Sequence, residues 1–214
     1  MTFRAIRILK EVDLVLAEDT RTSRKLFDHY DIPTPMRSFH AHNEHKTVSR
    51  VVDEIEGGTV MAQVSDAGTP GISDPGFLLV RECLERGVEI EVLPGATAFV
   101  PALLLSGFAM DKFRFEGFLP HKKGRQTKIQ EVLTAPETTI LYESPHRVIK
   151  MLEQMIEWGG AERRISLSRE ISKLHEETVR GTVEEALAHF NEKAPKGEFV
   201  VVLEGTTADQ KSKR

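Results

Sequence analysis

A loop that combines acidic residues, glycines and prolines, VSDAGTPGISDPG at residues 64–76, directly follows an apolar run. Gly68 and Gly71 permit backbone angles that other residues avoid, and the prolines stiffen the rest of the loop. A loop that leaves the carboxyl end of a parallel strand lies over the crevice where open α/β sheets bind ligands. Its carboxylates, Asp66 and Asp74, would repel phosphate and suit a ligand that offers hydroxyls, amines or positive charge, such as a ribose diol or a sulfonium amino acid.

The two carboxylates of this loop have different expected roles. Asp74 is predicted to cap the following helix, with Pro75 in its first turn, whereas Asp66 stands at the strand end, where no cap explains it. Neither GxxxxGK nor GxGxxG occurs in the loop, so a phosphate cradle is not indicated. A second turn, PGATA at residues 94–98, places further backbone N–H and C=O groups at the same predicted edge. The two loops together indicate a nucleoside-like ligand without phosphate.

The segment FHAHNEH, residues 39–45, is a candidate metal site. His40 and His42 would share a strand face, but His45 falls on the following helix, which Asn43 is predicted to cap. Structural metal sites usually show four ligands at regular spacing, so the pattern favours no metal.

Cys83 is the only cysteine of the chain, which excludes an intrachain disulfide and a cysteine metal cluster. It is predicted to be a buried thiol on a helical face that it shares with Phe77, Val80 and Leu84.

The predicted ligand loops need a parallel sheet to position them, and the first half of the chain provides one. Helices are predicted at residues 3–11, 20–30, 43–56, 75–86 and 97–106, and strands at 13–19, 59–65 and 88–93. Strands that lack a polar face and alternate with helices indicate a parallel sheet covered on both sides.

From about residue 110 the pattern changes to closely spaced, partly alternating strands. Strands are predicted at 113–119, 138–144, 163–171, 175–181 and 197–205, and helices at 125–134, 146–158 and 182–193. This pattern indicates a second, mixed-sheet domain. The fold class is therefore α/β with two domains, residues 1–110 and 111–205, followed by a tail at 206–214 that is predicted to be mobile.

Composition and charge exclude several classes of protein. Hydrophobic residues make up 40% and charged residues 29%, which is typical of a globular chain. No apolar run approaches the roughly 20 residues of a membrane span, and the amino terminus has no small-residue cleavage site, so the protein is expected to be cytoplasmic. A net charge of −4 excludes a generic polycation that coats nucleic acid.

A local basic segment nevertheless offers an RNA contact. Residues 117–130 contain no acid. The cations of this segment follow His121 closely in the sequence and are Lys122, Lys123, Arg125 and Lys128. Cations on a loop can hold phosphates, and a solvated turn is the alternative.

Six motifs, in chain order, resemble those of one family. They are DTRTS, SDAGTPGISDPG, LPGATA, FEGFLP, YESPHR and SREISKLHEETVRG. Over residues 1–205 the chain is similar to the ribosomal RNA small subunit methyltransferase I family, of the tetrapyrrole-methylase-like class of S-adenosylmethionine enzymes. The resemblance implies a parallel, Rossmann-like amino-terminal domain, a mixed-sheet carboxyl-terminal domain and the methyl donor in the cleft between them. It also implies a homodimer that 2′-O-methylates the ribose of a cytidine in 16S ribosomal RNA of the small subunit.

The resemblance also assigns the donor site. From the first domain it would comprise Asp66, Gly68, Thr69, Pro70, Ile72, Ser73, Ala96 and Thr97. From the second domain Phe118, Leu119, Tyr142 and Glu143 would close over the adenosine. Family members begin with a strand and a threonine-proline-isoleucine-glycine-asparagine type loop, which would normally contact the donor, ahead of the segment that matches MTFRAI. We expect that opening strand and loop to be missing from this sequence, which begins at MTFRAI.

Methyl transfer from a sulfonium to oxygen is an in-line displacement that needs mainly alignment and no metal. A ribose hydroxyl is a poor nucleophile, so a base, or a cation that stabilises the alkoxide, would help. Candidates are Asp19, Arg21, Glu143, Arg147, Arg169, Glu170 and Lys173. Spacing singles out none of them, and a structural ion pair is the alternative for each arginine-carboxylate neighbour.

Two other functions remain open. One is a tetrapyrrole (precorrin-type) methylase, although those enzymes usually have a glycine-aspartate-proline loop in place of SDAGTPGISDPG and lack YESPHR. The other is a donor-binding or ribosome-binding module without catalysis.

Overall fold

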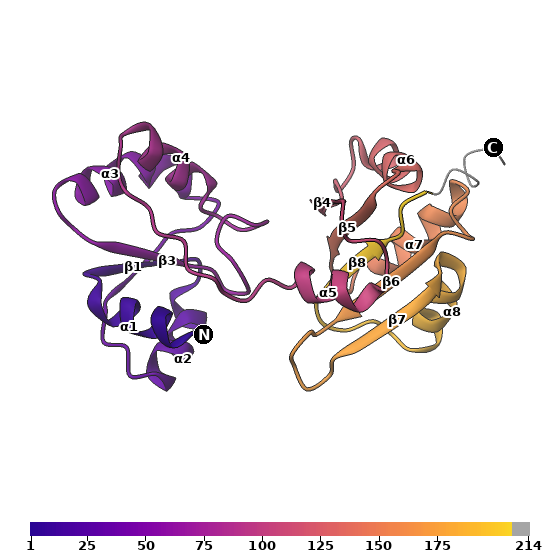
Figure 1. Ribbon diagram of the computed structural model, residues 1–214, viewed down its shortest axis with the longest axis horizontal. Coiled ribbons are helices and arrows are strands. Elements are labelled where there is room, and N and C mark those ends of the chain that lie inside the picture. Colours follow the sequence, from indigo (N-terminus) through magenta and orange to yellow (C-terminus); the bar gives the residue numbers. More distant parts are fainter. Residues whose placement is uncertain (207–214) are drawn as a thin grey trace. The chain divides into compact units, whose positions relative to one another are not determined.

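The computed structural model describes residues 1–206 of the 214-residue chain, so all but the first residue of the predicted tail lies outside the described residues. The chain divides into two compact units, Met1–Thr97 and a second that begins at Ala98 (Figure 1). Helix α5 (Phe99–Ser106) packs on the sheet of the second unit. The division at residues 110 and 111 stays a prediction.

The first unit contains a parallel sheet of three strands in the order β2-β1-β3. Its elements are α1 (Phe3–Glu11), β1 (Leu14–Ala17), α2 (Thr20–His29), β2 (Met36–Ser38), α3 (Glu44–Glu56), β3 (Met61–Val64) and α4 (Phe77–Glu85). Figure 1 shows α1 and α2 on one side of the sheet and α3 and α4 on the other. The predicted parallel sheet with helices on both faces is therefore confirmed.

Alternate residues of β1 build two separate cores. Val15 packs in a cluster with Phe27 of α2, while Leu16 packs with Val52 of α3 and Cys83 of α4. Because successive side chains of a strand point to opposite faces, a strand buried on both faces has no polar positions. The sequence of β1, LVLA, follows this rule.

Residues 88–93, predicted as a strand, form none. Val88 and Ile90 pack against the core of α3 and α4, but Val92 is 76% exposed. A strand needs backbone partners as well as apolar alternation, and within residues 1–206 no strand pairs with this segment. The short strand β2 was not predicted, because three residues directly after a proline turn are too few to show an alternation of apolar and polar side chains.

Helix α4 begins two residues later than predicted, so the N-cap position falls on Gly76 and not on Asp74. Gly76 occupies the N-cap position with φ 135°. The carboxylate of Glu44 accepts hydrogen bonds from the N–H groups of Gly76 and Leu78 instead. Asn43 occupies the N-cap position of α3, as predicted, but its side chain makes no cap hydrogen bond. Its Oδ1 accepts from the N–H of His40, and its Nδ2 donates to the carbonyl oxygen of Ser38.

The buried face of α4 consists of Leu79 and Cys83. Burial raises the pKa of the Cys83 thiol, and the predicted burial of this residue is confirmed. The predicted companions are wrong, since Phe77, Val80 and Leu84 are exposed. Apolar residues lie on several faces of this helix, so their spacing does not identify the face that meets the core.

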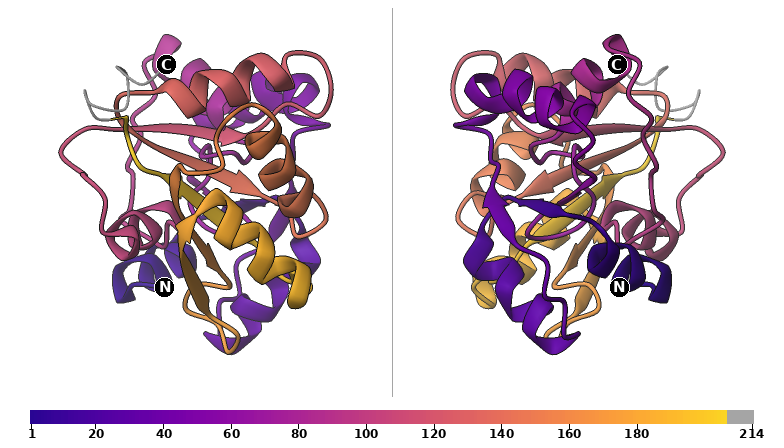
Figure 2. Two further views of the ribbon diagram at one scale, coloured as in Figure 1. Left: turned by 90° about the vertical axis from the view of Figure 1, so that its right-hand side faces the viewer. Right: turned by 90° about the vertical axis from the view of Figure 1, so that its left-hand side faces the viewer.

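The second unit contains a mixed sheet of five strands in the order β4-β5-β8-β6-β7, in which only the β4–β5 pair is parallel. Its elements after α5 are β4 (Phe113–Phe118), α6 (Arg125–Thr134), β5 (Thr138–Glu143), α7 (Val148–Glu157), β6 (Arg164–Arg169), β7 (Glu177–Thr182), α8 (Val183–Glu192) and β8 (Phe199–Leu203). Helices α6, α7 and α8 cover one face of this sheet and α5 covers the other (Figure 2). The predicted mixed sheet and all its predicted strands and helices are confirmed.

The helices within residues 1–206 include none that is both long and apolar enough to cross a lipid bilayer.

Candidate functional site

The loop at residues 64–76 leaves the carboxyl end of β3, as predicted, and exposes its first part while burying its last. Asp66 and Gly68 are exposed, whereas Pro75 and Gly76 are buried. Gly68 adopts φ 117° and Ser73 adopts φ 62°. Residues other than glycine rarely have such positive φ angles. The strain at Ser73 shows that surrounding contacts fix the loop.

Asp66 connects this loop to the end of β1. Its Oδ1 accepts a hydrogen bond of 3.1 Å from the N–H of Asp19, and its own N–H donates to Glu18 Oε2 at 3.3 Å. The carboxyl ends of two parallel strands therefore meet at one edge of the sheet. The second oxygen of Asp66 has room for a ligand, because the residue is exposed.

Asp19 and Arg21 form a local ion pair beside Asp66. The guanidinium of Arg21 bonds to both carboxylate oxygens of Asp19, at 3.1 and 2.7 Å, and hydrogen bonds from Arg21 lower the pKa of Asp19 to about 2. Asp19 also caps α2 by accepting from the Arg21 N–H. A carboxylate this acidic is a poor general base, since an efficient base has a pKa near the working pH.

Thr69 joins the loop to the second predicted turn. Its hydroxyl lies 3.0 Å from the carbonyl oxygen of Ala96 and 2.7 Å from the hydroxyl of Thr97. Because a hydroxyl has one proton, Thr69 donates to Ala96 and accepts from Thr97. The predicted convergence of the two loops is therefore realised within the first unit.

A cavity of about 480 Å³ opens next to Asp66, between α2 and the end of β3. Its polar lining includes Ser23, Lys25 and Ser65, and the Ser65 hydroxyl is buried without a hydrogen-bond partner. The exposed side of the loop offers a carboxylate, hydroxyls and backbone groups and has no lysine or arginine, since Lys25 belongs to the cavity wall on α2. This set of groups fits a cationic nucleoside better than a phosphate.

In the second unit, the predicted adenosine-facing residues lie at the ends of β4 and β5. Phe118 is 52% exposed and packs edge-on against Tyr142, with ring centroids 5.7 Å apart. Tyr142 also meets Phe115 edge-on at 5.1 Å. Leu119, in contrast, is 2% exposed and belongs to the core. Among Phe118, Leu119 and Tyr142, Phe118 therefore exposes the most apolar surface to a ligand.

Glu143 is a fully buried carboxylate between two arginines. Its oxygens lie 3.6 Å from Arg125 Nη2 and 3.6 Å from Arg147 Nε, and one accepts from the N–H of Ser144. Arg147 also donates to the carbonyl oxygen of Leu119, and Arg125 to that of Pro120. These three charged groups thus attach residues 119–120 to the end of β5, and the two arginines are already partnered inside the unit.

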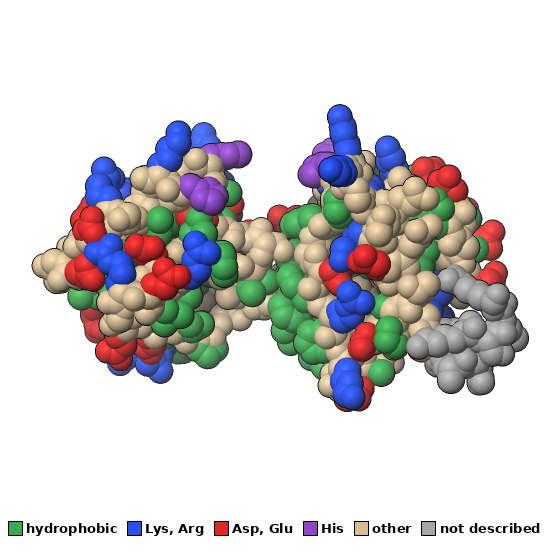
Figure 3. Space-filling view, turned by 90° about the horizontal axis from the view of Figure 1, so that it is seen from above, with side chains coloured by type: hydrophobic (Ala, Val, Ile, Leu, Met, Phe, Trp, Pro, Cys, Tyr) green, Lys and Arg blue, Asp and Glu red, His purple; other side chains and the backbone are tan. Residues whose placement is uncertain are grey.

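Of the predicted RNA-contacting cations, Lys122 and Lys123 are exposed and Arg125 is not. Arg125 is 6% exposed, its guanidinium also donates to Gln154, and burial lowers its pKa. Arg125 therefore lies inside the unit and holds the loop through its hydrogen bond to the carbonyl oxygen of Pro120. Figure 3 shows histidine side chains and side chains in the shared colour of lysine and arginine projecting together from one border of the second unit.

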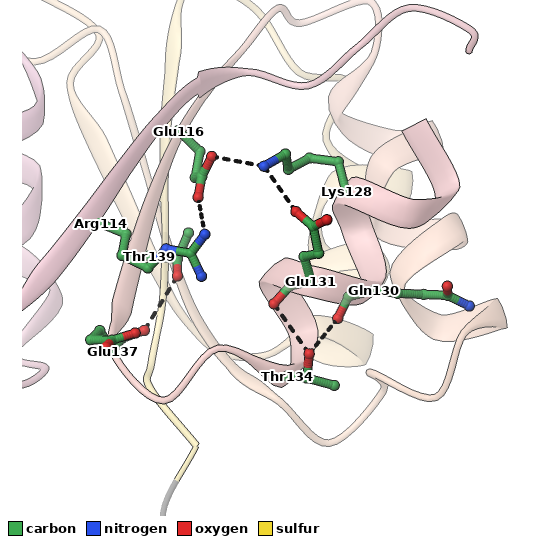
Figure 4. Close-up of polar contacts among 8 residues, drawn as sticks. All are labelled: Arg114, Glu116, Lys128, Gln130, Glu131, Thr134, Glu137 and Thr139. Atoms are coloured by element: carbon green, nitrogen blue, oxygen red, sulfur yellow. Dashed lines mark hydrogen bonds and ion pairs between the residues drawn. The ribbon is translucent and has the colours of Figure 1, made fainter. Parts of the chain in front are cut away.

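Lys128 is held by carboxylates. Its ammonium lies 3.1 Å from Glu116 and 2.9 Å from Glu131, and Glu116 also pairs with Arg114 (Figure 4). These ion pairs neutralise Lys128, which leaves Lys122 and Lys123 as the cations of the loop at residues 120–124 that point to solvent.

Three predicted catalytic candidates at the end of β6 belong to ion-pair networks. Arg169 Nε donates to Glu177 at 2.6 Å, and Lys173 Nζ lies 3.0 Å from Glu170 and 3.0 Å from Glu198. The backbone N–H of Glu198 also donates to Glu170, whose pKa is lowered by that bond and by Lys173. The structural ion pairs weighed as the alternative are therefore present.

Replacing Glu177 with glutamine is expected to destabilise the second unit by about 1–2 kcal/mol at neutral pH. A hydrogen bond from Lys193, then one from Arg169, lowers the pKa of Glu177 to about 2 from an ordinary 4.5, and His189 lies 3.4 Å away. A carboxyl pKa depressed by folding stabilises the protein above the unfolded pKa and loses this effect as pH falls through the folded pKa. The difference from wild type should thus be full above about pH 4.5 and vanish near pH 2. Urea unfolding followed by the fluorescence of Trp158, the only tryptophan, reports on this unit.

The control for this measurement is Glu162→Gln, an exposed carboxylate of the same unit. A difference for Glu177→Gln that does not change with pH would contradict the ion-pair explanation.

The histidines of residues 39–45 include one T-shaped pair, His40 and His42, with ring centroids 5.9 Å apart. Across residues 1–206, no group of three or more His, Cys, Asp or Glu side chains is arranged to hold a metal ion.

The tertiary structure brings the predicted residues together in two sets, one in each unit. Asp19, Arg21 and the donor residues of the first domain share one edge of the parallel sheet, and Glu143 and Arg147 lie with Leu119 at the end of β5. Glu44 and Gln63 contact the first set without having been predicted. Glu44 is 32 positions from the backbone it caps, so no local pattern identifies it.

Comparisons with known proteins find relatives that match nearly the whole chain. A sequence profile of the Tetrapyrrole (Corrin/Porphyrin) Methylases matches residues 1–187. A ribosomal RNA small subunit methyltransferase I of Synechocystis sp. is 46% identical over 212 residues, covering 99% of this chain and 76% of that protein. The protein of the same name from Thermotoga maritima is 42% identical over 205 residues, covering 96% and 92%.

Solved structures share the fold at lower sequence identity. A cobalt precorrin-4 methyltransferase matches with a TM-score of 0.67 and 17% identity, over 95% of this chain and 88% of the other. The uroporphyrin-III-C-methyltransferase of Thermus thermophilus matches with a TM-score of 0.62 and 20% identity, over 94% and 87%. At such identities the likeness concerns the fold alone.

Proposed function

Because the chain belongs to the tetrapyrrole methylase family, and within it to the ribosomal RNA small subunit methyltransferase I group of S-adenosylmethionine-dependent enzymes, we propose that it methylates the ribose 2′-hydroxyl of a cytidine in 16S ribosomal RNA. The substrate is the small ribosomal subunit, and the enzyme works in the cytoplasm as a homodimer. The nucleotide, the subunit and the dimer are carried over from the family resemblance.

The observation that carries the proposal is the fixed conformation of the loop at residues 64–76. Contacts through Asp66 and Thr69 hold it at the edge where the parallel strands end, with its acidic side exposed. S-adenosylmethionine supplies a methyl group already activated by a sulfonium charge. The chain would bind the donor through Asp66, Gly68, Thr69, Pro70, Ile72, Ser73, Ala96 and Thr97, and in the second unit through Phe118 and Tyr142. Leu119 and Glu143, whose side chains are buried, would support that surface from within the unit.

Orientation is the main contribution that these residues can make. In-line displacement requires the donor and the acceptor hydroxyl to be aligned, and a preformed loop provides one half of that alignment without reorganising. Among the acid-base candidates, Asp19 is ionised throughout the physiological range, so it holds Arg21 rather than accepting a proton. Arg21, with its side chain 89% exposed, remains a candidate cation for the developing alkoxide.

The activity is tested by incubating the protein with methyl-labelled S-adenosylmethionine and small ribosomal subunits that lack the modification. The label should appear in 16S RNA on a ribose 2′-oxygen of a cytidine. Label on a base, on protein or nowhere would overturn the proposal.

Replacing Lys122 and Lys123 together by alanine is expected to weaken binding to small subunits and to reduce the slope of log K against log salt by about 1.5–2. Each lysine that contacts a phosphate releases roughly one counterion, and both side chains are exposed on one loop. Binding is measured at several salt concentrations. The matched control is Lys112→Ala with Lys196→Ala, two exposed lysines of the same unit. An equal loss in both double variants would argue against a specific patch.

A further inference from the structure

Glu44 is a buried carboxylate that the proposed chemistry does not use. It is 7% exposed, at the first position of α3, within the segment that the sequence offered as a metal site. The partners of its Oε1 are two backbone groups, the N–H of Gly76 and the N–H of Leu78, each at 3.0 Å. The first N–H groups of a helix have no partner within the helix, and an anion there is favoured by the helix dipole. Glu44 therefore caps α4 from another helix.

Gln63 of β3 holds the same point of the chain from a second direction. Its Nε2 donates to the carbonyl oxygen of Pro75 at 2.8 Å. A Cβ on Gly76 would come within 2.7 Å of that amide, so the side chain of Gln63 lies directly against the backbone. Pro75 and Gly76 are both buried, and Pro75 accepts a further bond from the N–H of Gly71 within the loop.

The end of the ligand loop is thus attached to α3 and to β3 by side chains that do not belong to it. Its beginning is attached through Asp66 to the end of β1, and its middle through Thr69 to Ala96 and Thr97. The exposed residues between these attachments are the ones that a ligand can reach. Without the contact from Glu44, the buried N–H group of Gly76 and the partly buried N–H group of Leu78 would lose their partner, and the end of the loop would move to find another.

We propose that Glu44 is a positioning residue for the methyl donor: together with Gln63 it holds the carboxyl end of the loop at residues 64–76 in the conformation that binds S-adenosylmethionine. This inference depends on the proposed function. Glu44 acts through the backbone of the loop and contacts no reacting atom, so its effect is on donor affinity rather than on the chemical step. The acceptor oxygen of its side chain is the essential feature.

The test is donor binding by Glu44→Ala and Glu44→Gln, measured by calorimetry with S-adenosylmethionine. Glutamine retains an oxygen that accepts both N–H groups, whereas alanine has none. The dissociation constant should rise by about tenfold or more in Glu44→Ala and stay within about threefold of wild type in Glu44→Gln. In the methylation assay, the KM for the donor should rise in Glu44→Ala while kcat at saturating donor changes little.

Gln63→Leu is the second variant, used in case Glu44→Ala does not fold. It removes the bond to Pro75, and its donor affinity should fall in the same direction. Wild-type affinity in both Glu44→Ala and Gln63→Leu would overturn the inference, and so would equal losses in Glu44→Gln and Glu44→Ala. A wild-type protein that binds no S-adenosylmethionine would instead refute the proposed function.

Discussion

Replacing Asp66 with alanine is expected to raise the dissociation constant for S-adenosylmethionine by about tenfold to a hundredfold, the loss expected for a hydrogen bond to a charged group. Asp66 is exposed at the end of β3, and one of its oxygens also fixes the backbone of Asp19. Alanine removes both the ligand-facing carboxylate and this attachment. Calorimetry with purified protein measures the change directly.

Asp66→Asn separates the two roles of this side chain. Asparagine keeps an oxygen for the N–H of Asp19 but loses the charge, so its affinity should lie between those of wild type and Asp66→Ala. Glu89→Gln, an exposed carboxylate of the same unit outside both ligand loops, is the control and should bind the donor as wild type does. Wild-type affinity in Asp66→Ala would remove this loop from the donor site.

Replacing Glu143 with alanine is expected to cost about 3–5 kcal/mol of unfolding free energy, the largest stability effect that we predict. The Glu143 side chain is fully buried, and the Arg125 side chain is 7% exposed. Removal of the carboxylate leaves buried positive charge without compensation and weakens the contacts that hold residues 119–120. The measurement is urea unfolding of the second unit, followed by the fluorescence of Trp158, which packs against its core.

The matched control is Glu116→Ala, because Glu116 also pairs with two cations, Arg114 and Lys128, which are more exposed than Arg125 (Figure 4). Its loss should cost about 1 kcal/mol, since the side chains of Arg114 and Lys128 are 38% and 31% exposed and water screens them once the carboxylate is removed. A double variant, Arg125→Met with Glu143→Leu, should cost clearly less than the two single changes added together, because it leaves one charge fewer unpaired. Similar losses for Glu143→Ala and Glu116→Ala would show that burial of the charge is not the cause.

Much of the fold could be predicted from local pattern. The helices α1 and α6 begin and end at the predicted residues, and the strands of both sheets other than β2 were predicted. These elements have strong periodicity and clear boundaries. The segment at residues 88–93 has the same apolar alternation without becoming a strand, because strand formation depends on a neighbour as well as on its own residues.

The sequence predicted which residues belong to the candidate site, but not which role each of them has. Asp66 and Thr69 lie where the loop pattern and the family resemblance implied, at the end of a parallel strand. Arg125 was predicted as an exposed cation because its sequence neighbours are Lys122 and Lys123. The helix that it begins turns it inward, toward Glu143.

By itself the sequence determined the α/β class, the parallel and mixed sheets, the acidic character of the ligand loop and membership of a methyltransferase family, because these follow from periodicity, residue type and ordered motifs. Only the tertiary structure decided which charges are buried, which face of α4 meets the core and which side chain caps that helix. The physical reason is distance along the chain. Burial and capping depend on groups that folding brings together from far apart, such as Glu44 and Gly76, and no local pattern encodes such a pair.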